Sequence, residues 1–196
     1  MYVFGGKTSS TVFSNDIYSF DLKSFQWKLL DCKNKPTPRH GHLFFLNDDY
    51  LHVYGGNDDD KDFQDFFKIS VNSLDQWVPI NFTGVPPSTG RPLSSCYSDP
   101  GLLFVFGGYD RSLRLESRCL KILDLKKLVW NESQCWAKLQ DKNDIKQISI
   151  GSKGTEINPR YGHSINFNPD TAQLILYAGS ASTYLNDMII IDLIDD

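Results

Sequence analysis

The chain has 196 residues, 40% of them apolar, so it is long enough to bury a sizeable core. Its formal net charge of −4 excludes the strongly basic footprint of a nucleic-acid-binding protein. No apolar run approaches the length of a membrane span, and the first residues, MYVFGGKTSS, lack the charged and apolar segments of a secretory signal. We therefore expect a cytoplasmic protein whose partners include neither nucleic acid nor a membrane.

Taken in chain order, four apolar segments each end in two small residues. These segments are MYVFGG, LHVYGG, LFVFGG and LILYAG, and their last glycines, Gly6, Gly56, Gly108 and Gly179, lie 50, 52 and 71 residues apart. Two other markers keep a similar step, namely the tryptophans Trp27, Trp77 and Trp130 and the arginines Arg39, Arg91 and Arg160. Three independent markers with one period indicate an internal repeat.

Repeats of about 50 residues with four short strands each are typical of kelch β-propeller blades. The chain resembles the kelch-repeat family, in particular intracellular kelch proteins, through its glycine pairs, its PR(H/Y)GH segments and the tryptophan that follows each repeat. The resemblance implies an all-β fold, a fragment of a kelch-type β-propeller with four consecutive blades. The expected boundaries are blade 1 at 1–35, blade 2 at 36–87, blade 3 at 88–136 with an inserted loop at 137–158, and blade 4 at 159–196.

Within each blade the expected strands A to D follow the markers. Strand A opens after the arginine, strand B precedes the glycine pair, strand C holds segments such as NDIYSFDL and NDMIIIDL, and strand D starts near the tryptophan. The first blade lacks its strand A and the last lacks its strand D, which predicts two complete blades between two three-stranded ones. We expect these blades to form an open arc, with no helix longer than two turns.

The markers themselves have structural roles in such a blade. A glycine pair allows positive φ and a close approach of neighbouring backbones. Each tryptophan is expected to insert between neighbouring sheets, with its indole N–H hydrogen-bonded. We interpret three histidines at strand openings as structural and not as metal ligands, and the four cysteines as reduced packing thiols, because no zinc-type spacing occurs. These are His40, His42 and His163, and Cys32, Cys96, Cys119 and Cys135. Neither a metal nor a cofactor is expected.

The long third spacing contains an insertion between strand D of blade 3 and strand A of blade 4. The segment is polar with an apolar centre at Ile145, Ile148 and Ile150. We predict a partly ordered surface loop, and both a functional and a purely structural role remain open.

Charged residues gather in two of the loops that join strand B to strand C. The loop of blade 2 is acidic and the corresponding loop of blade 3 is basic, and the two are expected to be neighbours. The predicted partner-binding residues are Asp58, Asp59, Asp60 and Asp62, then Arg111, Arg114 and Arg118, with Phe63, Tyr109 and Tyr184 as aromatic anchors. The arginines would suit an acidic or phosphorylated partner. The alternative is that they pair with the aspartates and only solubilise the rim.

Enzyme signatures are absent from the sequence. We find no P-loop, no G-x-S-x-G and no H-E-x-x-H. The acidic loop also lacks the central glycine and final glutamate of an EF-hand. The expected function is therefore that of a protein–protein interaction module that acts as a scaffold or adaptor. The alternative is a fragment of a kelch-like metalloenzyme, of the copper oxidase or iron-dependent specifier type. A closed propeller would need more blades than these four, and we expect them to come from the rest of a longer chain or from self-association.

Overall fold

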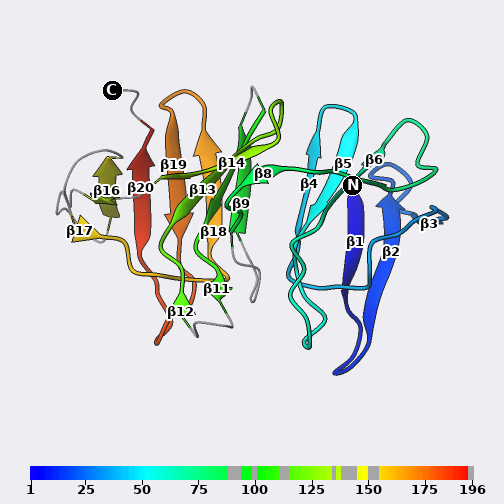
Figure 1. Ribbon diagram of the computed structural model, residues 1–196, viewed down its shortest axis with the longest axis horizontal. Helices are drawn as coiled ribbons and strands as arrows, with labels where there is room; N and C mark the ends of the chain where they lie inside the picture. Colours follow the sequence, from blue (N-terminus) through cyan, green and yellow to red (C-terminus); the bar gives the residue numbers. More distant parts are fainter. Residues whose placement is uncertain are drawn as a thin grey trace. The chain divides into compact units, whose positions relative to one another are not determined.

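The computed structural model describes residues 1–87, 94–98, 101–110, 115–133, 136–137, 145–149 and 155–193 (Figure 1). All regular structure in these residues is β-strand, which confirms the all-β prediction. The chain divides into two compact units, Met1–Asn81 and Phe82–Asp196. Each unit is described by itself below.

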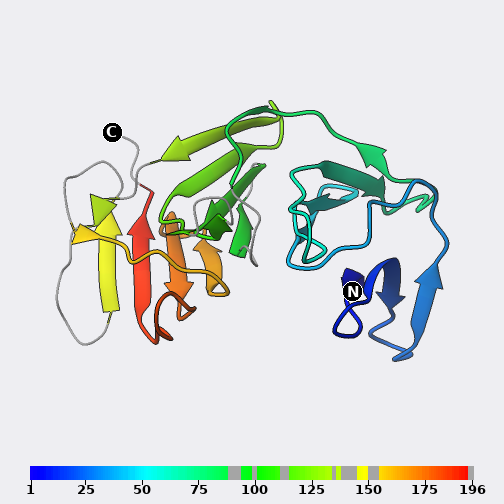
Figure 2. The ribbon, with the colours of Figure 1, turned by 60° about the horizontal axis from the view of Figure 1, so that its bottom comes forward.

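The first unit contains two antiparallel sheets (Figure 2). The first sheet has the order β1-β2-β3, with β1 at Tyr2–Lys7, β2 at Phe13–Phe20 and β3 at Trp27–Leu30. The second sheet has the order β4-β5-β6-β7, with β4 at Leu43–Asn47, β5 at Tyr50–Tyr54, β6 at Phe66–Ser70 and β7 at Val78–Pro79. Three strands followed by four is the order that the repeat markers predict.

The second unit contains the third and fourth sheets. The third sheet has the order β8-β14-β13-β10-β9, with β8 at Thr83–Gly84, β9 at Ser94–Ser98, β10 at Leu102–Phe106, β13 at Leu120–Asp124 and β14 at Val129–Ser133. The fourth has the order β16-β20-β19-β18, with β16 at Ile145–Ser149, β18 at Ser164–Asn168, β19 at Gln173–Tyr177 and β20 at Met188–Asp192. Two short ladders join β11 (Tyr109–Asp110) to β12 (Leu115–Glu116) and β15 (Trp136–Ala137) to β17 (Thr155–Glu156).

The fourth sheet differs from the prediction because it has a fourth strand. That strand, β16, comes from the insertion that was expected to be a surface loop, and it pairs in parallel with β20 from Ile145 opposite Met188 to Ser149 opposite Asp192. The physical reason is that, among the described residues of the fourth repeat, only β19 pairs with β20, so the other edge of β20 can pair with another segment. The β-branched residues Ile145 and Ile148 suit that segment to a strand.

The third sheet also gains a strand, because the chain that leaves the second sheet runs beside β14. Thr83 pairs in parallel with Val129, and Gly84 with Trp130. Gly84 has a φ of +85°, and a Cβ there would lie 2.1 Å from the carbonyl oxygen of Trp130, so only glycine fits without a shift of the backbone. A single parallel bridge from Lys33 to Gln76 repeats this arrangement between the first two sheets.

Each unit has one apolar core, between its two sheets. In the first unit Phe4, Ile17 and Leu30 of the first sheet pack against Leu51, Val53 and Ile69 of the second sheet. Trp77, which directly precedes β7, belongs to the same core. In the second unit Phe104, Phe106 and Leu120 pack against Leu174, Leu176, Ile189 and Ile191. Alternate residues of each strand point into these cores, as the period of two requires.

The three tryptophans have different surroundings. Trp77 is 1% exposed and packs on Phe4 with ring centroids 5.1 Å apart, which confirms its predicted place between sheets. Its indole N–H, however, has no hydrogen-bond partner, so that part of the prediction was wrong. Trp130 is buried, whereas Trp27 is 52% exposed and packs mainly on Phe20 of its own sheet. The prediction was therefore also wrong for Trp27, because no second sheet covers it.

Candidate functional site

Arg39, which opens the second repeat, holds the two ends of the loop that joins strand B to strand C in that repeat. The side chain of Arg39 is fully buried, and its Nη1 donates a 2.9 Å hydrogen bond to the carbonyl oxygen of Gly55. Its two Nη atoms also bind both carboxylate oxygens of Asp65, with Nη2 2.9 Å from Oδ2. Asp65 directly precedes β6, so this bidentate ion pair holds both ends of the loop between β5 and β6.

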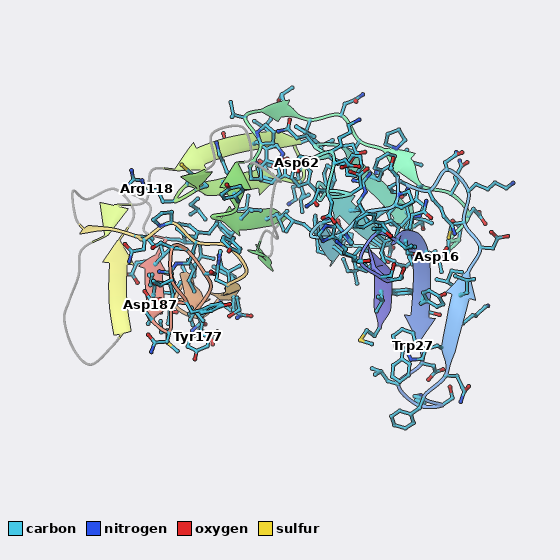
Figure 3. All side chains as sticks on the ribbon, turned by 90° about the horizontal axis from the view of Figure 1, so that it is seen from below. Asp16, Trp27, Asp62, Arg118, Tyr177 and Asp187 are labelled. Carbon is cyan, nitrogen blue, oxygen red and sulfur yellow. The ribbon has the colours of Figure 1, made fainter. Side chains whose placement is uncertain are left out.

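The fourth sheet repeats the same arrangement. Arg160 is fully buried, its Nη1 donates to the carbonyl oxygen of Ala178 at 2.9 Å, and its Nη1 and Nη2 bind Asp187 at 2.8 and 2.9 Å. Asp187, labelled in Figure 3, directly precedes β20. Removing one partner of such a pair leaves a buried charge unpaired, which typically costs about 3–5 kcal/mol of stability. The loops between β5 and β6 and between β19 and β20 are thus fixed by the same kind of ion pair.

The other two sheets lack this pair in the described residues. Asp16 holds the equivalent position before Ile17, but Lys35 Nζ binds its Oδ1 at 2.9 Å, and this hydrogen bond lowers the pKa of Asp16. Both partners of that pair are partly exposed, whereas Arg39 and Arg160 are fully buried, so the lysine pair stabilises the fold less than the arginine pairs. In the third sheet Cys119 holds the position, and Arg91 lies outside the described residues.

The glycine pairs bring this arginine segment against the preceding sheet. The N–H of Gly6 donates to the carbonyl oxygen of Arg39 at 2.8 Å, and the N–H of Gly108 donates to that of Arg160 at 3.0 Å. A Cβ on Gly107 would lie 2.1 Å from the carbonyl oxygen of Arg160. The predicted role of the glycines, positive φ and close backbone approach, is confirmed.

One histidine completes each of these two junctions as an uncharged packing group. His42 lies edge-on to Phe4 with ring centroids 5.3 Å apart, and His163 lies edge-on to Phe106 at 5.6 Å. Burial lowers the pKa of both to about 4, with the nearby arginines adding to the effect. Both rings are therefore neutral near pH 7, which agrees with the structural role inferred from the sequence.

The acidic loop between β5 and β6 is folded by its own carboxylates. Asp58 Oδ1 accepts hydrogen bonds from the backbone N–H groups of Asp60 and Lys61, at 3.2 and 2.7 Å. The N–H of Asp59 donates to Asn57 Oδ1 at 3.2 Å. Such Asx turns are the local preference of Asp and Asn, and they let Asp59 adopt its left-handed φ of 71°. The loop therefore has a defined backbone.

Asp59 connects this loop to the first sheet. Its carboxylate forms an ion pair with Lys7 Nζ, and its Oδ1 lies 3.0 Å from His40 Nε2. The ring of Phe13 stacks on His40 with centroids 5.3 Å apart. The hydrogen bond from Lys7 lowers the pKa of Asp59. Part of the acidic charge is therefore balanced within the unit by Lys7.

Phe63 lies beneath the loop. It is buried, and the guanidinium carbon of Arg39 lies 4.4 Å from the centre of its ring. The ring thus supports the arginine that anchors the loop. Asp62, labelled in Figure 3, is half-buried, whereas Asp59 and Asp60 are exposed.

The remaining predicted site residues belong to the second unit or lie outside the described residues. Arg118 is exposed and labelled in Figure 3, Tyr109 begins β11, and Tyr184 is 94% exposed in the loop between β19 and β20. Arg111 and Arg114 lie outside the described residues. The expected contact between the acidic and the basic loop joins two units that are described separately, and it stays a prediction.

Two sets of residues were missed by the sequence analysis. These are the buried pairs Arg39–Asp65 and Arg160–Asp187, and the cluster of Lys7, His40 and Asp59. The pairs had a sequence signal, because an aspartate precedes strand C 26 or 27 residues after the arginine. The cluster had none, since it depends on how the first two sheets pack.

The described residues show few other places for a ligand. A shallow hollow of about 550 Å³ lies at the outer edge of the second sheet, and its lining mixes Lys33 and Lys68 with Asp31 and Asp75. Among these residues no three His, Cys, Asp or Glu side chains gather as a metal site would require. No helix in the described part of the chain is long and apolar enough to cross a membrane. Cys32 is a buried free thiol whose Sγ lies 3.0 Å from the carbonyl oxygen of Leu74.

Known proteins share this repeat. Acyl-CoA-binding domain-containing protein 4 of Arabidopsis thaliana is 26% identical over 98% of the chain and 28% of its own length. The human Rab9 effector protein with kelch motifs is 29% identical over 83% of the chain and 40% of its own length, and human Kelch domain-containing protein 3 is 28% identical over 58% and 32%. The chain therefore spans well under half the length of these relatives. The family model of the KLHDC2/KLHL20/DRC7 Kelch-repeats domain matches residues 1–147, and the chain belongs to this kelch-repeat family.

Proposed function

We propose that the chain is a protein-interaction module that binds a protein partner through the loops at the end of the sheets where strand B passes to strand C. Kelch-repeat proteins are generally protein-interaction modules, and kelch-domain relatives are typically scaffolds or adaptors without enzymatic activity. The proposal places the module in the cytoplasm, where a free thiol such as that of Cys32 persists.

The observation that carries the proposal is the way the acidic loop is held. The Arg39–Asp65 pair fixes its base, Asx turns shape its tip, and Lys7 with His40 ties it to the first sheet. A loop fixed in this way loses little conformational entropy when a partner binds, which favours affinity. The exposed carboxylate of Asp60 supplies charge that steers association.

The partner's chemistry is proposed from the basic loop. Arg111, Arg114 and Arg118 would bind an acidic or phosphorylated segment, since a guanidinium binds a carboxylate or phosphate through two parallel hydrogen bonds. Asp58 to Asp62, with Tyr109 and Tyr184, would set the orientation of the partner and exclude basic competitors. No observation in the described residues favours the metalloenzyme alternative.

Charge reversal tests this proposal. The variant Arg111→Glu with Arg114→Glu should weaken capture of the partner by about 1–3 kcal/mol while the unfolding temperature stays unchanged. The matched control is Lys126→Glu with Lys127→Glu, which reverses two exposed lysines in the turn between β13 and β14, at the opposite end of the same sheet. Quantitative mass spectrometry of captured proteins is the readout. Equal loss in both variants, or loss only in the control, would contradict the proposal.

A further inference from the structure

One face of the first sheet is apolar and exposed. The strand register places Val3, Tyr18 and Leu29 in one row across the sheet, and Phe20 and Trp27 in the next. Leu29 is 53% exposed and Trp27 52%, and Val3 and Tyr18 are also exposed. We call this surface the open face, and its residues are Met1, Val3, Tyr18, Phe20, Trp27 and Leu29. Contiguous apolar surface of this kind usually marks an interaction site.

The internal repeat shows what covers such a face. When MYVFGG is aligned with LHVYGG, Val3 corresponds to Val53, and Trp27 corresponds to Trp77 by the tryptophan repeat. In the second sheet Val53 is fully buried and Trp77 is 1% exposed. They are covered by the opposite face of the neighbouring sheet, through Phe4, Ile17 and Leu30. The surface that fits the open face is therefore the face of another sheet that carries the residues equivalent to Phe4, Ile17 and Leu30.

The fourth sheet presents a face of that type. Tyr177 stands at the position of Phe4 before the small-residue pair, and it is 50% exposed. Tyr177 pairs with Met188, as Phe4 pairs with Ile17, and Ile175 pairs with Ile190 in the adjoining row. We call this surface the closing face, and its residues are Ile175, Tyr177, Met188 and Ile190. The other side of the same strands is already buried against the third sheet.

We infer that the chain associates head to tail with a second copy of itself, the open face of one copy packing on the closing face of the other. The occupant is a second copy because one chain carries both halves of a junction that it already forms internally. The contact is heterologous, since two different surfaces meet, so the assembly keeps one free open face at one end and one free closing face at the other. Trp27 and Tyr177, both labelled in Figure 3, are the largest side chains of the two faces.

Two variants and their mixture test the inference with the full 196-residue chain. Leu29→Lys places a charge on the open face, and Tyr177→Lys places one on the closing face. Both positions are about half exposed, so the fold should survive either change. The matched controls are Val12→Lys and Thr183→Lys, two exposed positions in loops that carry no residue of either face. Sedimentation velocity over a concentration series is the measurement, and circular dichroism checks the fold of each variant.

The wild-type chain and both controls should associate as concentration rises, whereas each face variant alone should lose at least tenfold in association constant. An equimolar mixture of the two face variants should form a one-to-one dimer that grows no further, because each supplies the face that the other lacks. A wild-type chain that stays monomeric would overturn the inference. So would a face variant that self-associates as well as wild type, or a mixture in which no dimer forms.

Discussion

At the scale of single residues, the fold depends on buried groups whose partners recur from sheet to sheet. Arg39 and Arg160 each donate to a backbone carbonyl oxygen, which lies 16 residues further along the chain for Arg39 and 18 for Arg160. Each also binds an aspartate, 26 residues further along for Arg39 and 27 for Arg160. The arginines were recognisable in the sequence as repeat markers, whereas their function as anchors was not, because it depends on burial. Bidentate geometry also requires arginine and not lysine.

The degenerate glycine pair of the fourth repeat leads to a stability prediction. Ala178 has a φ of 60°, and the equivalent residue Gly55 has a φ of 65°. A left-handed φ destabilises a residue that has a Cβ by about 1–2 kcal/mol, and glycine avoids this cost. Glycine also makes the unfolded chain more flexible, which offsets part of the gain in stability. Ala178→Gly should therefore raise the free energy of unfolding by about 0.5–1 kcal/mol in urea titration. Ala181→Gly, a position without positive φ, is the control and should be neutral or destabilising.

The buried histidines make stability depend on pH. Burial lowers the pKa of His42, His52 and His163 from 6.5 to about 4. Between these two values the unfolded chain binds more protons than the folded one, so the contribution is complete above pH 6.5 and is lost as the pH falls toward 4. Acidification from pH 7 to 5 should lower the free energy of unfolding by on the order of 1–2 kcal/mol for each histidine.

His52 allows this effect to be isolated. Its ring stacks on Phe45 with centroids 5.0 Å apart, and its Nδ1 lies 3.0 Å from the carbonyl oxygen of Tyr50. His52→Gln should reduce the loss between pH 7 and 5, whereas Leu46→Ala, at an exposed position of the neighbouring strand β4, should leave it unchanged. Urea titrations at the two pH values measure both. An unaltered pH dependence in His52→Gln would show that this group does not contribute.

At the scale of elements, the alternation of apolar residues and the turn residues of each repeat were enough to predict the strands of the first two sheets. The additional strands were not predictable in this way. β8 is two residues long and exists because the chain runs beside β14, and β16 exists because β20 has an open edge. Both depend on pairing partners far away in the sequence, which local pattern does not reveal.

The pairing of β16 with β20 can be tested by amide exchange. Gln147 lies opposite Ile190 in the parallel register, and proline there would remove a backbone N–H and disturb the ladder. Gln147→Pro should speed hydrogen exchange in Met188–Asp192 at least tenfold, while Gln147→Ala should leave it unchanged. Exchange rates equal in both variants would mean that β16 does not protect β20.

At the scale of the whole molecule, the sequence identified the family and the number of blades but only part of the candidate site. Asp58 to Asp62 do gather in one loop, as four aspartates within five positions must. The contacts of Asp59 with Lys7 and His40 depend on how the first two sheets pack. The sequence carries no local sign of such contacts. The open arc and the contact between the acidic and basic loops stay predictions.

The most direct test of the proposed function is to find which end of the sheets touches a protein partner. A photo-crosslinking amino acid is placed at Asp60 or Tyr184, in loops that pass from strand B to strand C, or at Asn72 or Lys126, in turns at the opposite end of their sheets. All four positions are exposed. After irradiation in cell lysate, we expect the same proteins to be crosslinked from Asp60 and Tyr184 and not from the other two. Crosslinks confined to Asn72 and Lys126, or none from any position, would contradict the account.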